Sequence, residues 1–380
     1  MERIALISAL MVACAGSSTD KEPAGDDSGS PPVEPLTFPE DPASTDVPVG
    51  VRTVDYGGIM AEVWYPAAES ARGQTPERVE LSEIGPQAVF DVLGNVELPG
   101  IDTRAIRDAP LRNTGEALPV VFFSHGFGGF AAQSVDLTSH LAGRGYVVLS
   151  TEHAGRSISD LLPCMFSPPL EGCTLSGEDP GPADITALLD ALTADPGFLE
   201  GQVDLDRLAV IGHSAGGGTT STLAASLDLD AAVVMAAPPE ISSDLPVLLL
   251  DGTCDGIVQE PGVVEAFEAV PNGSRVRMLG AGHLAFSDIC DLDFGTLAEE
   301  LLIPRDDINP ALLGQLLALG TDGCEGGTVT VPDCGAEFLP LETSHPVVRA
   351  SVTEFLDQHV RGVGSGLSSD YGADFEVTLP

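Results

Sequence analysis

The stretch Leu208-Ala-Val-Ile-Gly-His-Ser-Ala-Gly-Gly-Gly218 decides the fold of this chain. An apolar, β-branched run meets the pattern Gly-x-Ser-x-Gly at 212–216, and small and helix-forming residues follow. A serine that attacks a carbonyl must project from a very tight turn between a strand and a helix. Glycine is needed beside it because a side chain there would collide with neighbouring backbone. The stretch therefore predicts a nucleophile elbow with Ser214 at its tip; a glycine-rich turn in the core is the simpler alternative.

The charge of the chain limits its classes of partner. Of 380 residues, 58 are acidic and 16 are basic, so the formal net charge is -42. Such a surface repels phosphate backbones, so we expect no binding to nucleic acid. The length is sufficient for one large domain with insertions or for two ordinary domains.

The first 48 residues indicate export. Residues 1–13 carry an arginine, an apolar run and a small residue before Cys14, which resembles a bacterial lipoprotein signal with Cys14 as the lipidated residue. An ordinary secretory signal and a cytoplasmic start helix are the alternatives. Residues 14–48 are rich in Ser, Asp, Pro and Gly, which predicts a disordered linker. We expect a secreted protein, or one attached to the cell envelope only through this anchor.

Apolar strands alternate with helices in the folded domain, predicted at 49–360. A hairpin at 52–65 and an irregular segment at 66–117 come first. Strands predicted at 118–124, 146–151, 208–211, 231–236, 247–250 and 275–279 then alternate with helices at 132–144, 183–194, 219–226, 262–269 and 346–360. This alternation predicts an α/β fold with a mainly parallel sheet covered on both faces. Segments 154–183 and 290–340, the second with two helices, are predicted insertions near the site, and the tail 361–380 is expected to be loosely held.

A serine nucleophile needs a base, and the base needs an acid that orients it. After such an elbow the order along the chain is serine, acid, histidine. His283 is the candidate base because it lies in a glycine-flanked loop after the last predicted strand. Asp251 and Asp255 both follow the preceding strand. Asp255 is favoured because a side chain in the loop can turn toward a histidine, whereas Asp251 sits at the strand end.

The tetrahedral intermediate of acyl transfer carries an oxyanion, which preorganised N–H groups stabilise. The expected donors are the backbone N–H groups of Ala215, directly after the nucleophile, and of Phe127, in a glycine-rich loop after an earlier strand. Further residues of these loops are candidates for lining the site or shaping its loops, namely His125, His153, Arg156 and His213.

Seven cysteines are present, and none forms a metal-type Cys-x-x-Cys pair. With Cys14 set apart, the other six can form three disulfides in many connectivities. Proximity in the sequence suggests the pairs Cys164–Cys173, Cys324–Cys334 and, by elimination, Cys254–Cys290.

Five motifs together resemble the α/β-hydrolase superfamily: SHGFGG at 124–129, STEHAGRS at 150–157, GHSAGG at 212–217, DGTCD at 251–255 and GHLAFSD at 282–288. Within it the chain resembles platelet-activating-factor acetylhydrolases, dienelactone-hydrolase-like esterases and bacterial cutinases that cleave polyesters. The resemblance implies Ser214 as nucleophile, His283 as base and Asp255 as acid, with Phe127 and Ala215 as oxyanion donors. Dienelactone hydrolases carry a cysteine at the elbow, so the serine favours an ordinary esterase.

These observations predict a serine carboxylic-ester hydrolase that works through an acyl-enzyme intermediate and requires no metal or cofactor. Its expected partner is a small-molecule, lipid-like or polymeric ester. The alternatives are a lipase or cutinase-like polyester hydrolase, and a catalytically silent hydrolase fold that serves as a surface-binding protein. The acyl length, the alcohol and the oligomeric state stay open.

Overall fold

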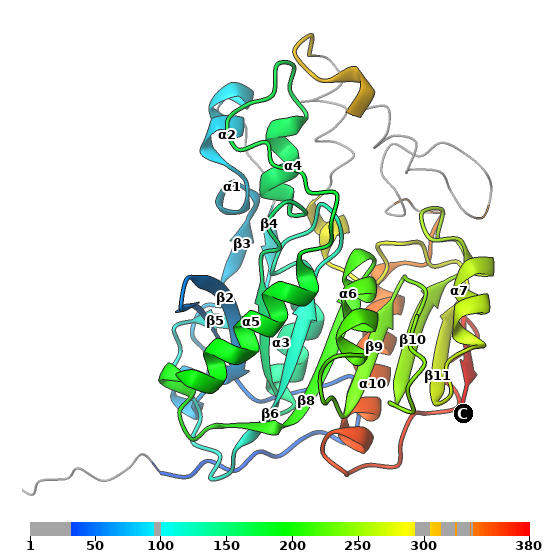
Figure 1. Ribbon diagram of the computed structural model, residues 1–380. Coiled ribbons are helices and arrows are strands. Elements are labelled where there is room, and N and C mark those ends of the chain that lie inside the picture. Colours follow the sequence, from blue (N-terminus) through cyan, green and yellow to red (C-terminus); the bar gives the residue numbers. More distant parts are fainter. Residues whose placement is uncertain (1–31, 95–99, 293–304, 313–323, 325–334, 336) are drawn as a thin grey trace, which may run out of the picture. The chain divides into compact units, whose positions relative to one another are not determined.

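The computed structural model describes residues 32–94, 100–292, 305–312, 324, 335 and 337–380 (Figure 1). The predicted signal, Cys14 and the first part of the linker lie outside the described residues, as do Cys334 and most of the helical pair predicted in the second insertion. Residues Val33–Pro380 form one unit. Among the described residues, no helix is both long enough and apolar enough to cross a membrane.

A ten-stranded sheet organises this unit, in the order β12-β11-β10-β9-β8-β6-β7-β2-β1-β5. Neighbours from β7 through β11 pair in parallel, whereas β2 and β12 run antiparallel to the strands beside them. The mainly parallel α/β arrangement predicted from the sequence is confirmed. The strands are β1 (Val49–Tyr56), β2 (Ile59–Pro66), β5 (Ala105–Arg107), β6 (Leu118–Ser124), β7 (Val147–Thr151), β8 (Val203–His213), β9 (Ala231–Met235), β10 (Val247–Gly252), β11 (Gly273–Met278) and β12 (Phe375–Thr378), with β3 (Arg78–Glu80) and β4 (Gly100–Asp102) as a separate pair.

Helices cover both faces of the sheet because its central strands are apolar on both sides. On one face, Val121 and Phe123 of β6 pack in a core that includes α3 (Val135–Gly143) and α10 (Leu341–His359). On the other face, alternate residues of the same strand pack with α5 (Gly181–Ala194) and α6 (Ala215–Ala224), and α7 (Glu260–Phe267) lies on that side near β10 (Figure 1). The shorter helices are α1 (Leu81–Ile84), α2 (Gln87–Leu93), α4 (Ile158–Cys164) and the 3-10 turns η1 (Glu69–Ala71), η2 (Gly197–Leu199) and η3 (Ile289–Leu292).

The prediction of a linker that continues to residue 48 is wrong for its last part. The ring of Phe38 lies 4.7 Å from the guanidinium carbon of Arg144 and 5.1 Å from that of Arg361. Glu34 lies 3.6 Å from Arg112 in an ion pair. These contacts hold an extended, proline-rich strap against the domain through cation–π and polar interactions. Such a strap has no apolar period, so its composition alone resembles disorder.

The predicted loosely held tail is also wrong at its end. Strand β12 pairs antiparallel with β11 over four residues and closes that edge of the sheet. Glu376 of β12 lies 2.6 Å from Arg277 of β11. A four-residue strand that is half exposed carries little periodic signal, so only the pairing itself identifies it.

A buried carboxyl, Asp288, joins the loop after β11 to the first turn of α3. Its Oδ2 accepts the backbone N–H of Asp136 at 2.9 Å, and its side chain is 5% exposed. Burial raises the pKa of Asp288 to about 7, although the nearby His345 acts in the opposite direction. The folded protein therefore holds a proton that the unfolded chain releases at a lower pH.

We expect Asp288 to make the protein less stable as the pH rises from about 4, where an unfolded aspartate ionises, to above about 7, where the folded one does. The variant Asp288→Asn keeps the acceptor oxygen but cannot ionise. Its free energy of unfolding, measured with urea, should increase relative to that of the wild type as the pH is raised through this window. For Asp206→Asn, at an exposed position, the free energy of unfolding should depend on pH in the same way as that of the wild type. If Asp288→Asn also showed the wild-type pH dependence, the ionisation of Asp288 would not be linked to folding.

Candidate active site

Ser214 occupies the turn between β8 and α6. Its backbone has φ 56° and ψ -119°, a region that is strained for a residue with a side chain. A Cβ added to Gly212 would lie 1.9 Å from the carbonyl oxygen of Gly216, and one added to Gly216 would lie 2.0 Å from that of Ser124. Both glycines of the pattern are therefore sterically required. Ser214 itself is partly exposed.

His283 and Asp255 lie within hydrogen-bonding distance, with Nδ1 of His283 2.8 Å from Oδ2 of Asp255. Both residues are buried, at 4% and 5% exposure. The other carboxylate oxygen accepts the backbone N–H groups of Ile257 at 2.9 Å and Val258 at 2.7 Å. The carboxylate is thus held in a fixed orientation. A proton on Nδ1 of His283 leaves Nε2 as the nitrogen that can accept one.

Asp251, the alternative acid, is engaged elsewhere. Its two carboxylate oxygens accept hydrogen bonds from Nε and Nη2 of Arg275 at 2.7 Å and 2.5 Å. Arg275 lies on β11, the strand that pairs with β10. Such a bidentate pair is a structural tie between neighbouring strands. The structure therefore brings Asp255, and not Asp251, to His283.

The two expected oxyanion donors lie in neighbouring turns. Within the described part of the chain, the backbone N–H groups of Phe127 and Ala215 donate no hydrogen bond to another backbone group. Ala215 is the first residue of α6, and the N–H groups at a helix start carry partial positive charge and have no partner inside the helix. A Cβ on Gly126, which precedes Phe127, would lie 3.2 Å from Cβ of Ser214. The two turns therefore meet beside the serine.

The four remaining residues named from the sequence are buried, with exposures of 0% for His125, 0% for His153, 4% for Arg156 and 2% for His213. Arg156 holds the loop at 125–129, which carries the expected oxyanion donor Phe127, through hydrogen bonds. Its Nη2 donates to the carbonyl of His125 at 2.8 Å and to Oγ of Ser124 at 2.9 Å, and its Nη1 pairs with Asp179. These residues shape the loops and do not line an open site. Asp179 was missed from the sequence because it lies in an irregular loop without a motif.

A second Ser-His-Asp arrangement lies beneath the same loop. Oγ of Ser124 is 3.0 Å from Nε2 of His153, whose Nδ1 is 2.9 Å from Oδ2 of Asp184. Ser124 and His153 are both 0% exposed, so a substrate cannot reach this hydroxyl. Burial lowers the pKa of His153, against the effect of Asp184. The arrangement ties β6, β7 and α5 together as a buried polar network.

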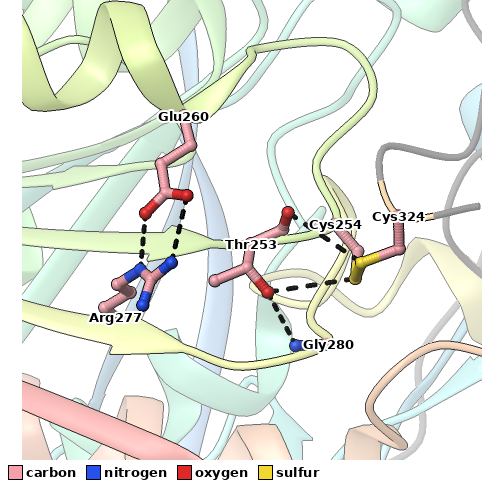
Figure 2. Close-up of a disulfide and its surroundings, with 6 residues drawn as sticks. All are labelled: Thr253, Cys254, Glu260, Arg277, Gly280 and Cys324. Carbon is pink, nitrogen blue, oxygen red and sulfur yellow. Dashed lines mark hydrogen bonds and ion pairs between the residues drawn. A yellow bond between two sulfur atoms is a disulfide. The ribbon is translucent and has the colours of Figure 1, made fainter.

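The disulfides correct two sequence predictions. Cys164 and Cys173 form a bridge, as predicted. The predicted pairs Cys254–Cys290 and Cys324–Cys334 are wrong, because Cys254 bonds to Cys324 (Figure 2); Cys290 is disulfide-bonded as well. Proximity in the sequence suggested the wrong pairing because the fold places Cys324 against the loop after β10. Figure 2 also shows Thr253, whose Oγ1 accepts the N–H of Gly280 at 2.9 Å and so links the acid loop to the histidine loop.

We expect the double variant Cys254→Ser/Cys324→Ser to lose both stability and activity. The bridge joins residues 70 positions apart, and chain entropy assigns about 4 kcal/mol of the free energy of unfolding to such a closure. Because Cys254 directly precedes Asp255, the acid loop should also move and ester hydrolysis should fall. Thermal unfolding and initial rates measure the two effects. Cys164→Ser/Cys173→Ser is the matched control: it should lower the Tm but change the rate less, and an equal loss of rate would contradict the special role of the first bridge.

Comparison with known proteins gives three similarities. Residues 54–164 match the family of platelet-activating factor acetylhydrolase, isoform II. The chain is 27% identical over 189 residues to the platelet-activating factor acetylhydrolase of Cavia porcellus, and the match covers 41% of this chain and 42% of that protein, less than half of either. A solved ferulic acid esterase from Streptomyces cinnamoneus has a TM-score of 0.58 and 25% identity, over 88% of this chain and 97% of that one.

Proposed function

We propose that this chain, an α/β-hydrolase that resembles the platelet-activating-factor acetylhydrolases and a ferulic acid esterase, hydrolyses carboxylic esters with Ser214 as nucleophile, His283 as base and Asp255 as acid. The observation that carries the proposal is the 2.8 Å contact between His283 and Asp255. These residues follow β11 and β10, and Ser214 follows β8, in one run of parallel strands. Parallel strands bring their carboxyl ends to the same edge of a sheet, which is where such folds bind ligands.

The reaction follows from these positions. Nε2 of His283 takes the proton from Ser214 as its oxygen attacks the ester carbonyl, and the N–H groups of Phe127 and Ala215 stabilise the oxyanion. Collapse of this intermediate breaks the bond to the alcohol, which leaves with the proton from His283. Water then loses a proton to the same nitrogen as it attacks the acyl-enzyme. Collapse of the second intermediate breaks the bond to Ser214, whose oxygen takes the proton back from His283, and the acid is released. Since only a neutral imidazole can accept the first proton, activity falls as the pH is lowered.

The proposed substrate is a small or lipid-like ester. Phe127, whose N–H is an expected oxyanion donor, is 51% exposed, and an exposed ring there offers apolar surface to an acyl or aryl group. A polyester hydrolase is the second candidate, favoured by the same ring if the surface around it is open to a polymer chain.

A fluorophosphonate probe together with an ester panel tests the proposal. The probe should label the wild-type protein at Ser214, which peptide mapping identifies. The panel contains p-nitrophenyl acetate, butyrate and octanoate, methyl ferulate and a polyester film. Turnover of the soluble esters without release from the film supports a small-ester hydrolase, and release from the film supports the second candidate. Neither labelling nor turnover would reject the esterase and favour the silent binding protein.

We further propose that the protein is exported and that Cys14 carries the lipid. Two disulfides support this, Cys164–Cys173 and Cys254–Cys324, because such bonds persist in oxidising compartments. Expression of the full chain in a bacterial host, followed by fractionation, should find it in the membrane fraction and Cys14→Ser in the soluble fraction. The same distribution for both proteins would remove the lipid anchor from the proposal.

A further inference from the structure

Gln133 lies in the loop between β6 and α3 and is 1% exposed. Its side chain reaches two of the turns described above. Oε1 accepts the backbone N–H of Gly126 at 3.0 Å, and Nε2 lies 2.8 Å from Nδ1 of His213. A Cβ added to Gly129 would lie 2.1 Å from Oε1, so the last glycine of the oxyanion loop leaves room for this amide.

The direction of each hydrogen bond in this bridge is determined. Because Oε1 of Gln133 accepts from Gly126, the amide NH₂ group faces His213 and donates to its Nδ1. His213 therefore carries its proton on Nε2, which donates to the carbonyl of His283 at 2.9 Å. Burial, with a smaller contribution from His283, lowers the pKa of His213 to about 3. The ring thus stays neutral, and Nδ1 keeps the lone pair that the amide needs.

The bridge touches all three turns that carry the proposed chemistry. Gly126 precedes Phe127, His213 precedes Ser214, and the carbonyl at the far end belongs to His283 itself. The rings of His213 and His283 also pack with centroids 4.9 Å apart. The main-chain carbonyl of Gln133 accepts the N–H of Asp288 at 2.9 Å, which adds a second tie to the segment that follows His283.

We infer that Gln133 is a positioning residue that acts through His213 and fixes the oxyanion donor, the nucleophile and the base relative to one another. The inference rests on the proposed function, because the three turns matter together only if they act on one ester. A displacement of about 1 Å among reacting groups can cost about 10²-fold in rate. Because the buried amide of Gln133 connects all three turns, its loss can displace the reacting groups and lower the rate although Gln133 does not contact the substrate.

The variant Gln133→Met tests the inference, since it keeps the length of the side chain and removes its donor and acceptor. We expect kcat for a p-nitrophenyl ester to fall about 10- to 100-fold with little change in KM, and the rate of inactivation by a fluorophosphonate to fall in parallel. Thr353→Val is the matched control. It removes one buried hydrogen bond, to Nε2 of His140 at 3.1 Å, from the packing of α10 on α3, and should leave kcat unchanged in folded protein.

The variant Gln133→Glu adds a readout that a merely structural role would not move. Once ionised, its carboxylate has no proton to give to His213, the titratable ring that it faces, so the activity of the variant relative to the wild type should be lowest at high pH. Protonation at lower pH restores an O–H donor, so the ratio of variant to wild-type kcat/KM should rise as the pH falls. A constant ratio, or a Gln133→Met protein that keeps wild-type kcat and inactivation rate, would overturn the inference.

Nitrogen-15 NMR of His213 separates this inference from the proposed function. The wild type should show the proton on Nε2 and a hydrogen-bonded lone pair on Nδ1, and Gln133→Met should lose the second signature. The opposite tautomer in the wild type would overturn the bridge even if the protein hydrolyses esters. A wild type with the expected tautomer that neither labels nor turns over esters would instead reject the proposed function, and the positioning role with it.

Discussion

Ser214→Ala is expected to lower kcat for ester hydrolysis by about 10⁶-fold, the loss seen when a catalytic unit of serine, histidine and acid loses its nucleophile. Ser214 is partly exposed at a strained turn, and the variant removes the only atom that the proposed mechanism acylates. Rates with a p-nitrophenyl ester, normalised to folded protein, measure the loss. Covalent labelling by a fluorophosphonate should disappear completely, since no residual binding can replace the missing oxygen.

Two other serines provide controls for this prediction. Ser221 is a buried hydroxyl of the same helix that donates to the carbonyl of Gly217 at 3.0 Å, so Ser221→Ala should keep both labelling and turnover. Ser124 belongs to the second Ser-His-Asp arrangement and is 0% exposed. Ser124→Ala should therefore lower stability but still label. If labelling disappeared in Ser124→Ala and persisted in Ser214→Ala, the nucleophile would be the buried serine and the proposed site would be wrong.

Because the backbone of Ser214 is strained, two substitutions at this position should differ in stability although both abolish activity. Glycine adopts positive φ without a steric penalty, so Ser214→Gly should unfold at a higher temperature than Ser214→Ala while it is equally inactive. A residue in an unfavourable backbone region typically costs about 1–3 kcal/mol. The cost persists here because the two flanking glycines and the ends of β8 and α6 fix the turn.

The features that could be predicted from the sequence are local. Strands β6, β7, β9 and β10 are buried along their whole length and form nearly continuous apolar runs, as does the second half of β8, whereas β11 alternates between buried and partly exposed residues. Several of the motifs begin at or near the end of such a run. The glycines of the elbow are visible in the sequence because no residue with a side chain fits at position 212 or at position 216. Because the strands are parallel, the loops that follow them all lie at one edge of the sheet, and the sequence therefore also predicts that the motifs in these loops lie close together.

The features that could not be predicted depend on contacts between distant segments. The partner of Cys254 lies 70 residues away, and nothing near either cysteine identifies the other. Gln133 has no motif of its own, and its importance is apparent only when Gly126 and His213 are seen on either side of it. The strap that contains Phe38 is held by Arg144 and Arg361, which are far apart in the sequence, and composition does not reveal such contacts.

The choice between Asp251 and Asp255 shows the same limit at closer range. Both aspartates follow one apolar run, and the sequence separates them only by four positions. The pairing of β10 with β11 decides, because it places Asp251 beside the arginines of β11. Asp255 lies beyond that pairing, where its carboxylate turns to His283. Strand register therefore distinguishes a structural ion pair from a candidate catalytic acid.

This distinction predicts opposite effects for two conservative variants. Asp255→Asn should lower kcat by about 10⁴-fold and leave stability nearly unchanged. The amide oxygen can still accept the N–H groups of Ile257 and Val258, which turns the NH₂ group toward Nδ1 of His283. That nitrogen then becomes an acceptor, the ring proton moves to Nε2, and the base can no longer take a proton from Ser214.

Asp251→Asn should do the reverse. The side chain of Arg275 is only 12% exposed, and a buried charge without its partner costs about 3–5 kcal/mol; Glu260, 3.1 Å from the same guanidinium, offsets part of this. The free energy of unfolding should therefore fall, while kcat for folded protein stays near the wild-type value. Urea unfolding and initial rates on both variants complete the comparison. If Asp251→Asn lost kcat and Asp255→Asn kept it, the acid would be the strand-end aspartate, and the 2.8 Å contact with His283 would have only a structural role.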